Sequence, residues 1–521
     1  KKQEIRGMTD LKIFWEGSQF VYHSLALINR ELCLQLIDRG LDVTIIPYEN
    51  HQFKADVDTR FRKISERLTT TISRPADIHV RHQWPPKFTA PPGGGHWVII
   101  QPWEYGRLRK EWVEPMRDLI DEIWIPSNFV RKTYIESGIQ PEKVFVIPNG
   151  FNPEIFNPSV KPFPVKTDKK FKFLFVGGTI WRKGADVLVN AYIKTFTASD
   201  DVSLIIKDIG HDSFYKGMGI GEQLKKIQDN PSMPEIIYIK DFLSEKEMAG
   251  LYTACDCLLH PYRGEGFAFP VLEAMACGKP VIVTKGGATD DFCKEEFTFH
   301  VSAEWIKITF PDMELAGGEG MVLEPSMDSL IKNMRDLYEN YPSAMEKAAR
   351  ALEFVKSHYT WDKIGNILIE RINKLRNKPV LRHEKIKTLM KRGEMFFTDG
   401  NTDEAMKCFS TILDIEHSSG KTHSHMAALY WKRNDRVNAL KHIKEAIKFS
   451  PCDSDVVWNY GHIMTERGQK SDAFKAYKEY LSKNPHDAEI KSLFDKLVKE
   501  EEIRKASSHE KKKKDKKKKK K

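Results

Sequence analysis

Short apolar runs alternate with longer amphipathic stretches from residue 11 onward, and this alternation limits the fold more than any other feature. The first three segments are LKIFWEG (11–17), HSLALINRELCLQLIDRG (23–40) and LDVTIIPYE (41–49). A strand, a helix and a strand at this spacing are typical of a right-handed βαβ unit in a parallel sheet. The pattern therefore predicts an α/β protein.

A second series of strand and helix patterns follows after a break. The stretch NPEIFNPSVKPFPVKTDKK (152–170) is rich in proline and basic residues, and we predict that it is a linker. We therefore expect two Rossmann-like domains, residues 1–160 and 161–378, that face a cleft. A long amphipathic helix within 357–378 is expected to return across both domains. In open α/β sheets, ligands bind beyond the carboxyl ends of the strands.

Beyond Pro379 the pattern is all-helical and repeats every 34 residues. This interval separates Ala405, Ala439 and Ala473, and it also separates Pro451 from Pro485. Small residues at helix contacts and proline at the repeat end are typical of tetratricopeptide repeats. We predict an all-α tetratricopeptide solenoid over 379–504, with three repeats and a capping helix.

The formal net charge of +10 is concentrated at one end of the chain. The segment 511–521 has ten lysines and one aspartate, so the rest of the chain is near +1. This distribution argues against a nucleic-acid partner. We predict that 505–521 is a disordered polylysine tail, which either keeps the protein soluble or contacts an anionic membrane surface.

Seven cysteines are scattered through the sequence, and no Cys or His pair complements the nearby Cys255 and Cys257. We predict buried thiols in a reducing compartment and no metal site. No run approaches the roughly 18 apolar residues that a membrane-spanning helix needs. The expected location is the cytoplasm, with peripheral membrane contact as the alternative for the lysine tail.

The segment EGFAFPVLEAMACGKPVIV (265–283) carries two glutamates eight positions apart. Glu265 falls in a predicted loop after a strand, and Glu273 falls on the helix that follows. A helix N-terminus presents backbone N–H groups to anions such as phosphate, and a helix carboxylate can accept from ribose hydroxyls. The alternative interpretation is a capping interaction for Glu265 and a surface charge for Glu273.

A second loop, FVGGTIWRKG (175–184), has Gly177 and Gly178 directly after a strand and Arg182 and Lys183 before a helix. Paired cations in a glycine-rich loop suit a diphosphate, because Arg182 can bind two oxygens at once and Lys183 acts as a point charge. Two solvated basic residues are the alternative. The loop fits neither the Walker A pattern nor the dinucleotide fingerprint.

Together with DEIWIPSNFVRKTYIESGIQPEKVFVIPNGFNPEIFNP (121–158), these motifs resemble the retaining glycosyltransferases of family 4, group 1 type, which have the GT-B fold. The resemblance covers roughly residues 11–374. It implies a retaining hexosyltransferase that moves a sugar from a nucleotide-diphosphate sugar to an acceptor, with no cofactor and no required metal.

The resemblance also implies roles for individual residues. Arg182, Lys183 and Glu265 would be the catalytic groups: the cations hold the diphosphate and stabilise the leaving group, and Glu265 contacts the sugar hydroxyls. Glu273 would bind the ribose, and Gly17 would let the first-domain backbone approach the diphosphate. The remaining donor-binding positions would be Gly177, Gly178, Gly266, Phe267 and Ala268.

Two positions depart from the family pattern. Gly178 stands where many members have arginine, so the phosphate contacts would rest on Arg182 and Lys183. A His-Asp pair of the first domain is replaced by IIQPWEYGRL, which contains Glu104, and the nearest histidine is His82. His82 and Glu104 are therefore the acceptor-side candidates, although a glutamate in a loop is often only solvated.

The solenoid predicts a protein or peptide acceptor, or a partner subunit, because such arrays bind extended peptides. A glycan or lipid-linked acceptor, with the repeats serving dimerisation, is the alternative. Two further hypotheses are a tetratricopeptide scaffold whose GT-B portion is catalytically inactive, and a nucleotide-sugar epimerase.

Overall fold

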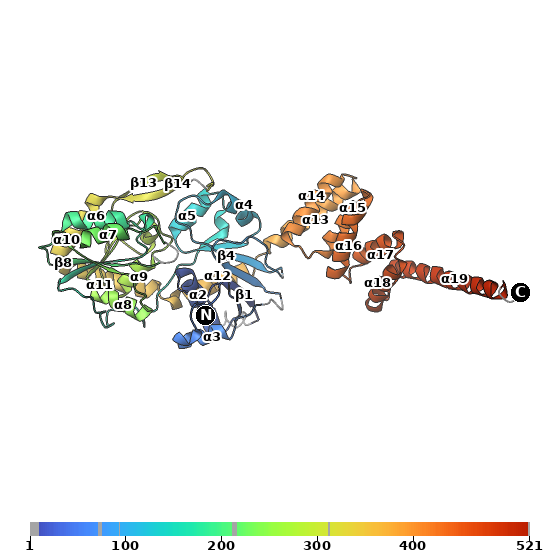
Figure 1. The fold of residues 1–521 in the computed structure, drawn as a ribbon, viewed down its shortest axis with the longest axis horizontal. Helices are drawn as coiled ribbons and strands as arrows, with labels where there is room; N and C mark the ends of the chain where they lie inside the picture. Colours follow the sequence, from blue (N-terminus) through green and yellow to red (C-terminus); the bar gives the residue numbers. More distant parts are fainter. Residues whose placement is uncertain (1–9, 71–74, 93, 211–215, 311–312, 519–521) are drawn as a thin grey trace. The chain divides into compact units, whose positions relative to one another are not determined.

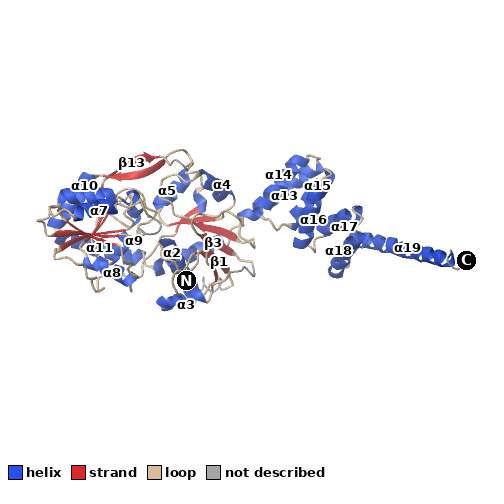
Figure 2. Ribbon diagram, in the orientation of Figure 1, coloured by secondary structure: helices blue, strands red, loops and turns tan. Residues whose placement is uncertain are grey.

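The computed structural model describes residues 10–70, 75–92, 94–210, 216–310 and 313–518. The described chain divides into two compact units, and the boundary lies between Val380 and Leu381 (Figure 1). The first unit contains two parallel sheets covered by helices, and the second contains helices only (Figure 2).

The first sheet belongs to the N-terminal domain, and its six strands are all parallel in the order β2-β1-β3-β4-β5-β6. The strands are β1 (Lys12–Gly17), β2 (Asp42–Ile46), β3 (Ile78–His82), β4 (His96–Ile100), β5 (Glu122–Ile125) and β6 (Val144–Val146). The helices are α2 (Ser24–Asp38), α3 (Arg62–Ser65), α4 (Lys110–Asp118) and α5 (Asn128–Glu136), with 3-10 turns η1 (Ala55–Val57), η2 (Thr59–Phe61) and η3 (Pro141–Lys143).

The second sheet is also parallel, in the order β12-β11-β10-β7-β8-β9. Its strands are β7 (Phe171–Val176), β8 (Val202–Lys207), β9 (Glu235–Ile239), β10 (Cys257–His260), β11 (Val281–Thr284) and β12 (Phe299–Val301). The helices are α6 (Ala185–Thr195), α7 (Gly221–Gln228), α8 (Glu245–Ala254), α9 (Phe269–Ala276), α10 (Met327–Glu339) and α11 (Tyr341–His358), with 3-10 turns η4 (Trp181–Lys183) and η5 (Ala288–Asp291). The two sheets confirm the predicted pair of Rossmann-like domains.

Helix α12 (Trp361–Leu375) follows the second domain in sequence but packs in the core of the first. Trp361, Ile364 and Leu368 are buried in one cluster with Leu32 and Leu36 of α2. The sequence prediction assigned this helix to the second domain as a return helix. Its apolar face packs back into the first-domain core.

A hairpin of β13 (Ala303–Ile308) and β14 (Gly320–Pro325) is inserted after β12. It lies apart from both parallel sheets (Figure 2). Phe310 and Leu315, in the segment that joins its strands, pack with Trp97 and Trp103 of the first domain. The sequence analysis did not predict this hairpin, although AEWIKI (303–308) has the alternation of a strand.

The second unit is an all-α array whose helix pairs follow the predicted 34-residue period. The helices are α13 (Leu381–Thr398), α14 (Thr402–Ile415), α15 (Gly420–Lys432), α16 (Arg436–Phe449), α17 (Ser454–Glu466), α18 (Lys470–Lys483) and α19 (Ala488–Lys518). Ala405, Ala439 and Ala473 are fully buried. A Cβ on Gly393 would lie 2.6 Å from Phe409, and one on Gly461 would lie 2.0 Å from Tyr477, so these repeat positions require small residues.

Helix α19 extends to Lys518, whereas we predicted disorder from residue 505. Lysine has a high intrinsic helix propensity, and the helix propagates from a packed start at residue 488, which accounts for the difference. Residues 519–521 lie outside the described part of the chain.

Six cysteines are buried free thiols, and Cys452 is the exposed exception to the prediction. Within the described ranges, no helix has the length and apolar character needed to cross a bilayer. The same residues contain no cluster of three or more His, Cys, Asp or Glu suited to a metal ion.

Candidate functional site

The candidate site lies at the carboxyl ends of β7 and β10, where three predicted residues meet. Lys183 Nζ lies 2.5 Å from Glu265 Oε1, and Arg182 approaches Glu265 Oε2 to 3.8 Å. Glu265 is only 6% exposed. The structure therefore brings two cations and one carboxylate together from loops 82 positions apart in sequence.

His260, the last residue of β10, is a member of this cluster that the sequence analysis missed. Its Nε2 lies 3.2 Å from Glu265 Oε1, and its ring is fully buried. Burial lowers the pKa of His260, which favours the neutral ring. The only sequence signal was a histidine at a strand end, five positions before Glu265.

The charges around Glu265 determine its ionisation. Burial by itself would raise the pKa of this carboxyl, but the Lys183 charge, the His260 hydrogen bond and the Arg182 charge hold the pKa well below its usual range. Glu265 is therefore a carboxylate at neutral pH. Helix α9 begins at Phe269, and its N-cap Ala268 makes no side-chain hydrogen bond. Among the described residues, the partners of the Glu265 carboxylate are Lys183, His260 and Arg182.

Glycines and one aspartate determine the shape of the loop at residues 177–184. Gly177 has φ +147°, and a Cβ there would lie 3.0 Å from Lys183 Cδ. Gly178 follows in the same loop and is buried. The next residue, Thr179, donates to Asp208 Oδ2 at 2.8 Å, so the aspartate after β8 anchors the loop.

The start of α9 is held against the first domain. Gly266 O accepts a 2.9 Å hydrogen bond from Ser127 Oγ at the start of α5. Phe267 is packed in the second-domain core, and Ala268 has φ 72° and ψ 70°, a left-handed conformation unusual for a non-glycine residue. Such strained residues gather at functional sites.

Glu273, on α9, has a different environment from Glu265. It is half-buried and accepts a 2.7 Å hydrogen bond from Tyr252 OH. Burial raises its pKa to about 7, and the nearby Glu245 charge acts in the same direction. Two carboxylates with pKa values pushed in opposite directions are characteristic of functional sites.

The loop after β4 of the first domain lies against the loop that carries Glu265. A Cβ on Gly264 would lie 2.5 Å from Glu104 O, and one on Gly266 would lie 4.0 Å from Glu104 Oε1. The neighbouring Tyr105 ring has the Arg182 guanidinium 5.9 Å from its centroid. The structure therefore places the acceptor-side candidate Glu104 next to the Glu265 loop.

His82 and Gly17 lie in a different, packed polar cluster of the first domain. His82 is buried, its Nδ1 lies 2.9 Å from Asn29 Oδ1, and burial lowers its pKa to about 3. A Cβ on Gly17 would lie 2.5 Å from Asn29 Nδ2 and 2.7 Å from His82 O. The described contacts of both residues are internal to the first domain, and Gly17 permits close packing there.

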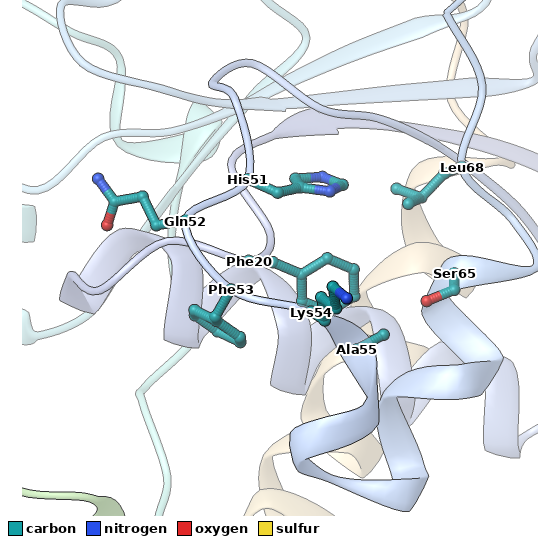
Figure 3. Close-up of a pocket in the computed structure, with 8 residues that line it drawn as sticks. All are labelled: Phe20, His51, Gln52, Phe53, Lys54, Ala55, Ser65 and Leu68. Atoms are coloured by element: carbon teal, nitrogen blue, oxygen red, sulfur yellow. The ribbon is translucent and has the colours of Figure 1, made fainter.

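The first domain also contains a pocket of about 380 Å³ beside the loop that follows β1 (Figure 3). It contains none of the residues predicted from the sequence. Its lining combines aromatic rings with polar side chains: Phe20, His51, Gln52, Phe53, Lys54, Ala55, Ser65 and Leu68.

Residues 158–352 match the protein family described as glycosyl transferases group 1. A putative glycosyltransferase of Sulfolobus islandicus filamentous virus is 26% identical over 193 residues, which cover 36% of this chain and 47% of that protein. An uncharacterised glycosyltransferase of Methanocaldococcus jannaschii is 32% identical over 173 residues, 32% of this chain and 41% of that protein. A D-inositol 3-phosphate glycosyltransferase of Arthrobacter is 28% identical over 151 residues, with coverages of 28% and 35%. The chain thus spans less than half the length of these relatives.

Two solved structures show the same architecture. A glycosyltransferase from Rickettsia africae has a TM-score of 0.53 at 14% identity, over 71% of this chain and 100% of that one. The Anabaena protein HepE in complex with UDP has a TM-score of 0.50 at 13% identity, with coverages of 70% and 100%. These likenesses confirm the predicted GT-B fold.

Proposed function

We propose that this protein is a glycosyltransferase that moves a sugar from a nucleotide-diphosphate sugar to an acceptor with retention of configuration. The observation that carries the proposal is the buried cluster of Arg182, Lys183 and Glu265 at the carboxyl ends of the strands. The match of residues 158–352 to group 1 glycosyl transferases supports it.

Arg182 and Lys183 stabilise the charge that develops on the diphosphate as the bond to the sugar breaks. In the structure, Lys183 is paired with Glu265. Donor binding moves the lysine toward the phosphate oxygens and frees Glu265 to accept from sugar hydroxyls. Preorganised charges of this kind are usually the largest single contribution to catalysis.

Glu273 binds the ribose, since a carboxylate can accept from both ribose hydroxyls. Glu104 orients the acceptor from the first domain, because its side chain lies beside Gly266 and therefore close to the transferred sugar. Retention requires the acceptor to approach from the face that the diphosphate leaves. No metal is required, because the two cations take its role.

We propose that the acceptor is a protein or peptide and that the helical array is a tetratricopeptide domain that binds it. The 34-residue period with buried alanines at equivalent positions supports the repeat assignment. Transfer to a polypeptide should then be lost in a chain ending at Lys378, while donor hydrolysis continues. Equal transfer by both chains would contradict this acceptor class.

The first experiment measures release of nucleoside diphosphate from UDP-, GDP- and ADP-sugars, with and without EDTA. We expect turnover of one donor, unaffected by EDTA, and a loss of about 10²–10³-fold in Lys183→Ala and Glu265→Gln. Lys285→Ala is the matched control, because this lysine pairs with Glu295 on the surface of the same domain. NMR of the product's anomeric configuration tests retention.

Absence of turnover with every donor, together with no thermal stabilisation by any nucleotide, would contradict the proposed function. It would favour the scaffold hypothesis, in which the GT-B portion is inactive.

A further inference from the structure

Arg263, two residues before Glu265, is a buried arginine held between two carboxylates. Its Nε and Nη2 lie 2.6 and 2.7 Å from the oxygens of Glu324. Its Nη1 and Nη2 lie 2.7 and 2.9 Å from those of Asp186. All three guanidinium nitrogens thus bond to protein, and two carboxylates outweigh its single charge. Arg263 is therefore not a phosphate ligand.

The same residue joins the two loops of the candidate site. Its Nη1 donates to Trp181 O at 2.7 Å, and its guanidinium lies 4.5 Å from the centroid of the Trp181 ring. The backbone N–H of Arg263 donates to Arg182 O at 2.8 Å, and Arg182 Nη1 returns a 2.6 Å bond to Gly264 O. The turn that carries Arg182 and Lys183 is thereby fixed against the loop that carries Glu265.

Glycine at position 184 makes this close approach possible. Gly184 has φ +70°, and a Cβ there would lie 1.8 Å from Pro261 O, in the loop that leads to Arg263. The backbones of the two loops are therefore in direct contact at Gly184 and Pro261. The Arg263 side chain joins the same two loops through its hydrogen bond to Trp181 O.

Through Glu324, Arg263 is also connected to the hairpin. Glu324 lies on β14, where Leu323 N donates to Arg263 O at 2.9 Å. The hairpin is in turn bonded to the first domain, since Met321 N donates to Tyr105 O at 3.1 Å and Ala316 N to Leu108 O at 2.8 Å. Tyr105 follows the acceptor-side candidate Glu104 in sequence.

We propose that Arg263 is a positioning residue that fixes the position of the Arg182–Lys183 turn relative to Glu265. Through β14 it also holds the loop of Glu104 in place beside these residues. This rests on the proposed function. Arg263 acts through its neighbours and touches neither donor nor acceptor. Because small misplacements of reacting groups cost about 10²-fold in rate, its loss affects the chemical step more than binding.

The test compares Arg263→Lys and Arg263→Met with the wild-type chain. Lysine keeps the charge but is a point donor that cannot bind two carboxylates in a planar, bidentate manner. Asp186 and Glu324 are about a third exposed, so water can hydrate them in either variant and folding is retained. We expect kcat to fall about 10–100-fold in Arg263→Met and less in Arg263→Lys. The donor Kd should change less than about threefold, because Arg182 and Lys183 remain.

Arg371→Met is the matched control. Arg371 also binds a glutamate with two nitrogens: its Nε and Nη2 lie 2.8 and 2.5 Å from the oxygens of Glu122. Its guanidinium lies over the ring of Phe145 in the first domain. A similar fall of kcat in Arg371→Met would overturn the proposal, since the effect would be one of general stability. Unchanged kcat in Arg263→Met, or a tenfold weaker donor Kd with unchanged kcat, would overturn it as well.

Hydrogen exchange provides a readout that does not depend on turnover. Peptides that contain 105–108, 263–264 and 321–323 should exchange faster in Arg263→Met than in Arg371→Met. If the wild-type chain turns over no donor, the proposed function fails. The hydrogen-exchange rates of these peptides then test the positioning role independently of turnover. Unchanged exchange in these peptides would then overturn it.

Discussion

Lys183 and Glu265 neutralise one another in a nearly dry site, with side chains 14% and 8% exposed. Breaking a buried pair leaves an uncompensated charge, which costs about 3 kcal/mol or more, whereas removal of both charges is often neutral. Under the proposed function, the same pair must separate when a donor enters. Its stabilising and catalytic contributions can therefore be measured separately.

Lys183→Met should lower the free energy of unfolding by about 3 kcal/mol, because Glu265 loses its main counter-charge. The double variant Lys183→Met/Glu265→Gln should recover most of this stability and none of the donor turnover. Denaturant unfolding and nucleotide release measure the two effects. A double variant less stable than Lys183→Met would show that the pair is not the source of the loss.

The raised pKa of Glu273 leads us to expect opposite pH dependences for protein stability and donor binding. Its pKa rises from 4.5 to about 7 in the folded protein, so its contribution to stability is complete below about pH 4.5 and is lost as the pH rises through about 7. Binding of a nucleotide sugar should strengthen over the same upper range, because the ionised carboxylate accepts ribose hydroxyls more strongly.

Glu273→Gln should flatten both dependences between pH 5 and pH 8 and weaken donor binding at pH 8. Thermal unfolding and calorimetry at several pH values provide the measurements. The nucleotide sugar is the appropriate ligand, because its diphosphate diester does not titrate in this range. An unchanged pH profile in the variant would place the titrating group elsewhere.

At the scale of elements, hairpin β13–β14 connects the two domains of the first unit. The isolated bridge between Arg109 and Leu315 and the 2.7 Å ion pair between Lys110 and Glu314 add to the bonds described above. Trp305 of β13 stacks on Phe129 of α5, with ring centroids 6.0 Å apart. The hairpin therefore restricts separation of the domains.

Gly106→Ala should detach the hairpin from the loop after β4. Gly106 has φ +77°, and a Cβ there would lie 2.9 Å from both Met321 N and Met321 O. Gly40→Ala is the control, because Gly40 has φ +83° and no atom within 4 Å of its Cβ. In each variant the free energy of unfolding should fall by about 1 kcal/mol, because alanine must adopt a left-handed backbone conformation.

Only Gly106→Ala should also accelerate hydrogen exchange in peptides that contain Met321. Equal exchange in the Gly106 and Gly40 variants would indicate that the hairpin stays attached. It would also show that the steric contact can relax.

At the scale of the whole molecule, the last helix of the first unit determines where the chain can be divided. Trp361, Ile364 and Leu368 of α12 are buried in the first-domain core, and a buried side chain of this size contributes about 1.5–3 kcal/mol. Arg371 of α12 also pairs with Glu122, which is fully buried on β5. The first unit therefore includes α12.

A chain ending at Lys378 should unfold cooperatively and retain donor turnover, whereas one ending at His358 should lack stable structure. A fragment of residues 381–518 should show its own helical transition, because it contains separate apolar clusters. Circular dichroism during thermal unfolding distinguishes these outcomes. Stable folding of the chain ending at His358 would mean that α12 is dispensable.

The sequence by itself determined the class of the fold, because its signals are local. Strand and helix periodicities predicted two parallel sheets, although no strand was predicted at β12, and the 34-residue spacing predicted the helical array. The loops with Gly177, Lys183 and Glu265 could be chosen because glycines and charges at strand ends are visible in the sequence alone. The disordered tail was the local prediction that differed, since composition does not distinguish a solvated coil from a solvated helix.

Only the tertiary structure decided which of these residues meet. Lys183 and Glu265 are 82 positions apart, and Arg39, which follows α2, binds Asp362 of α12 across 323 positions. His260, Arg263 and Asp208 were missed because a single buried polar residue carries no periodic signal. Glu104 lies against Gly264 and Gly266 of the second domain, whereas the hydrogen bond of the His82 ring is to Asn29 within the first domain. Such long-range packing depends on complementary surfaces, which no short stretch of sequence encodes.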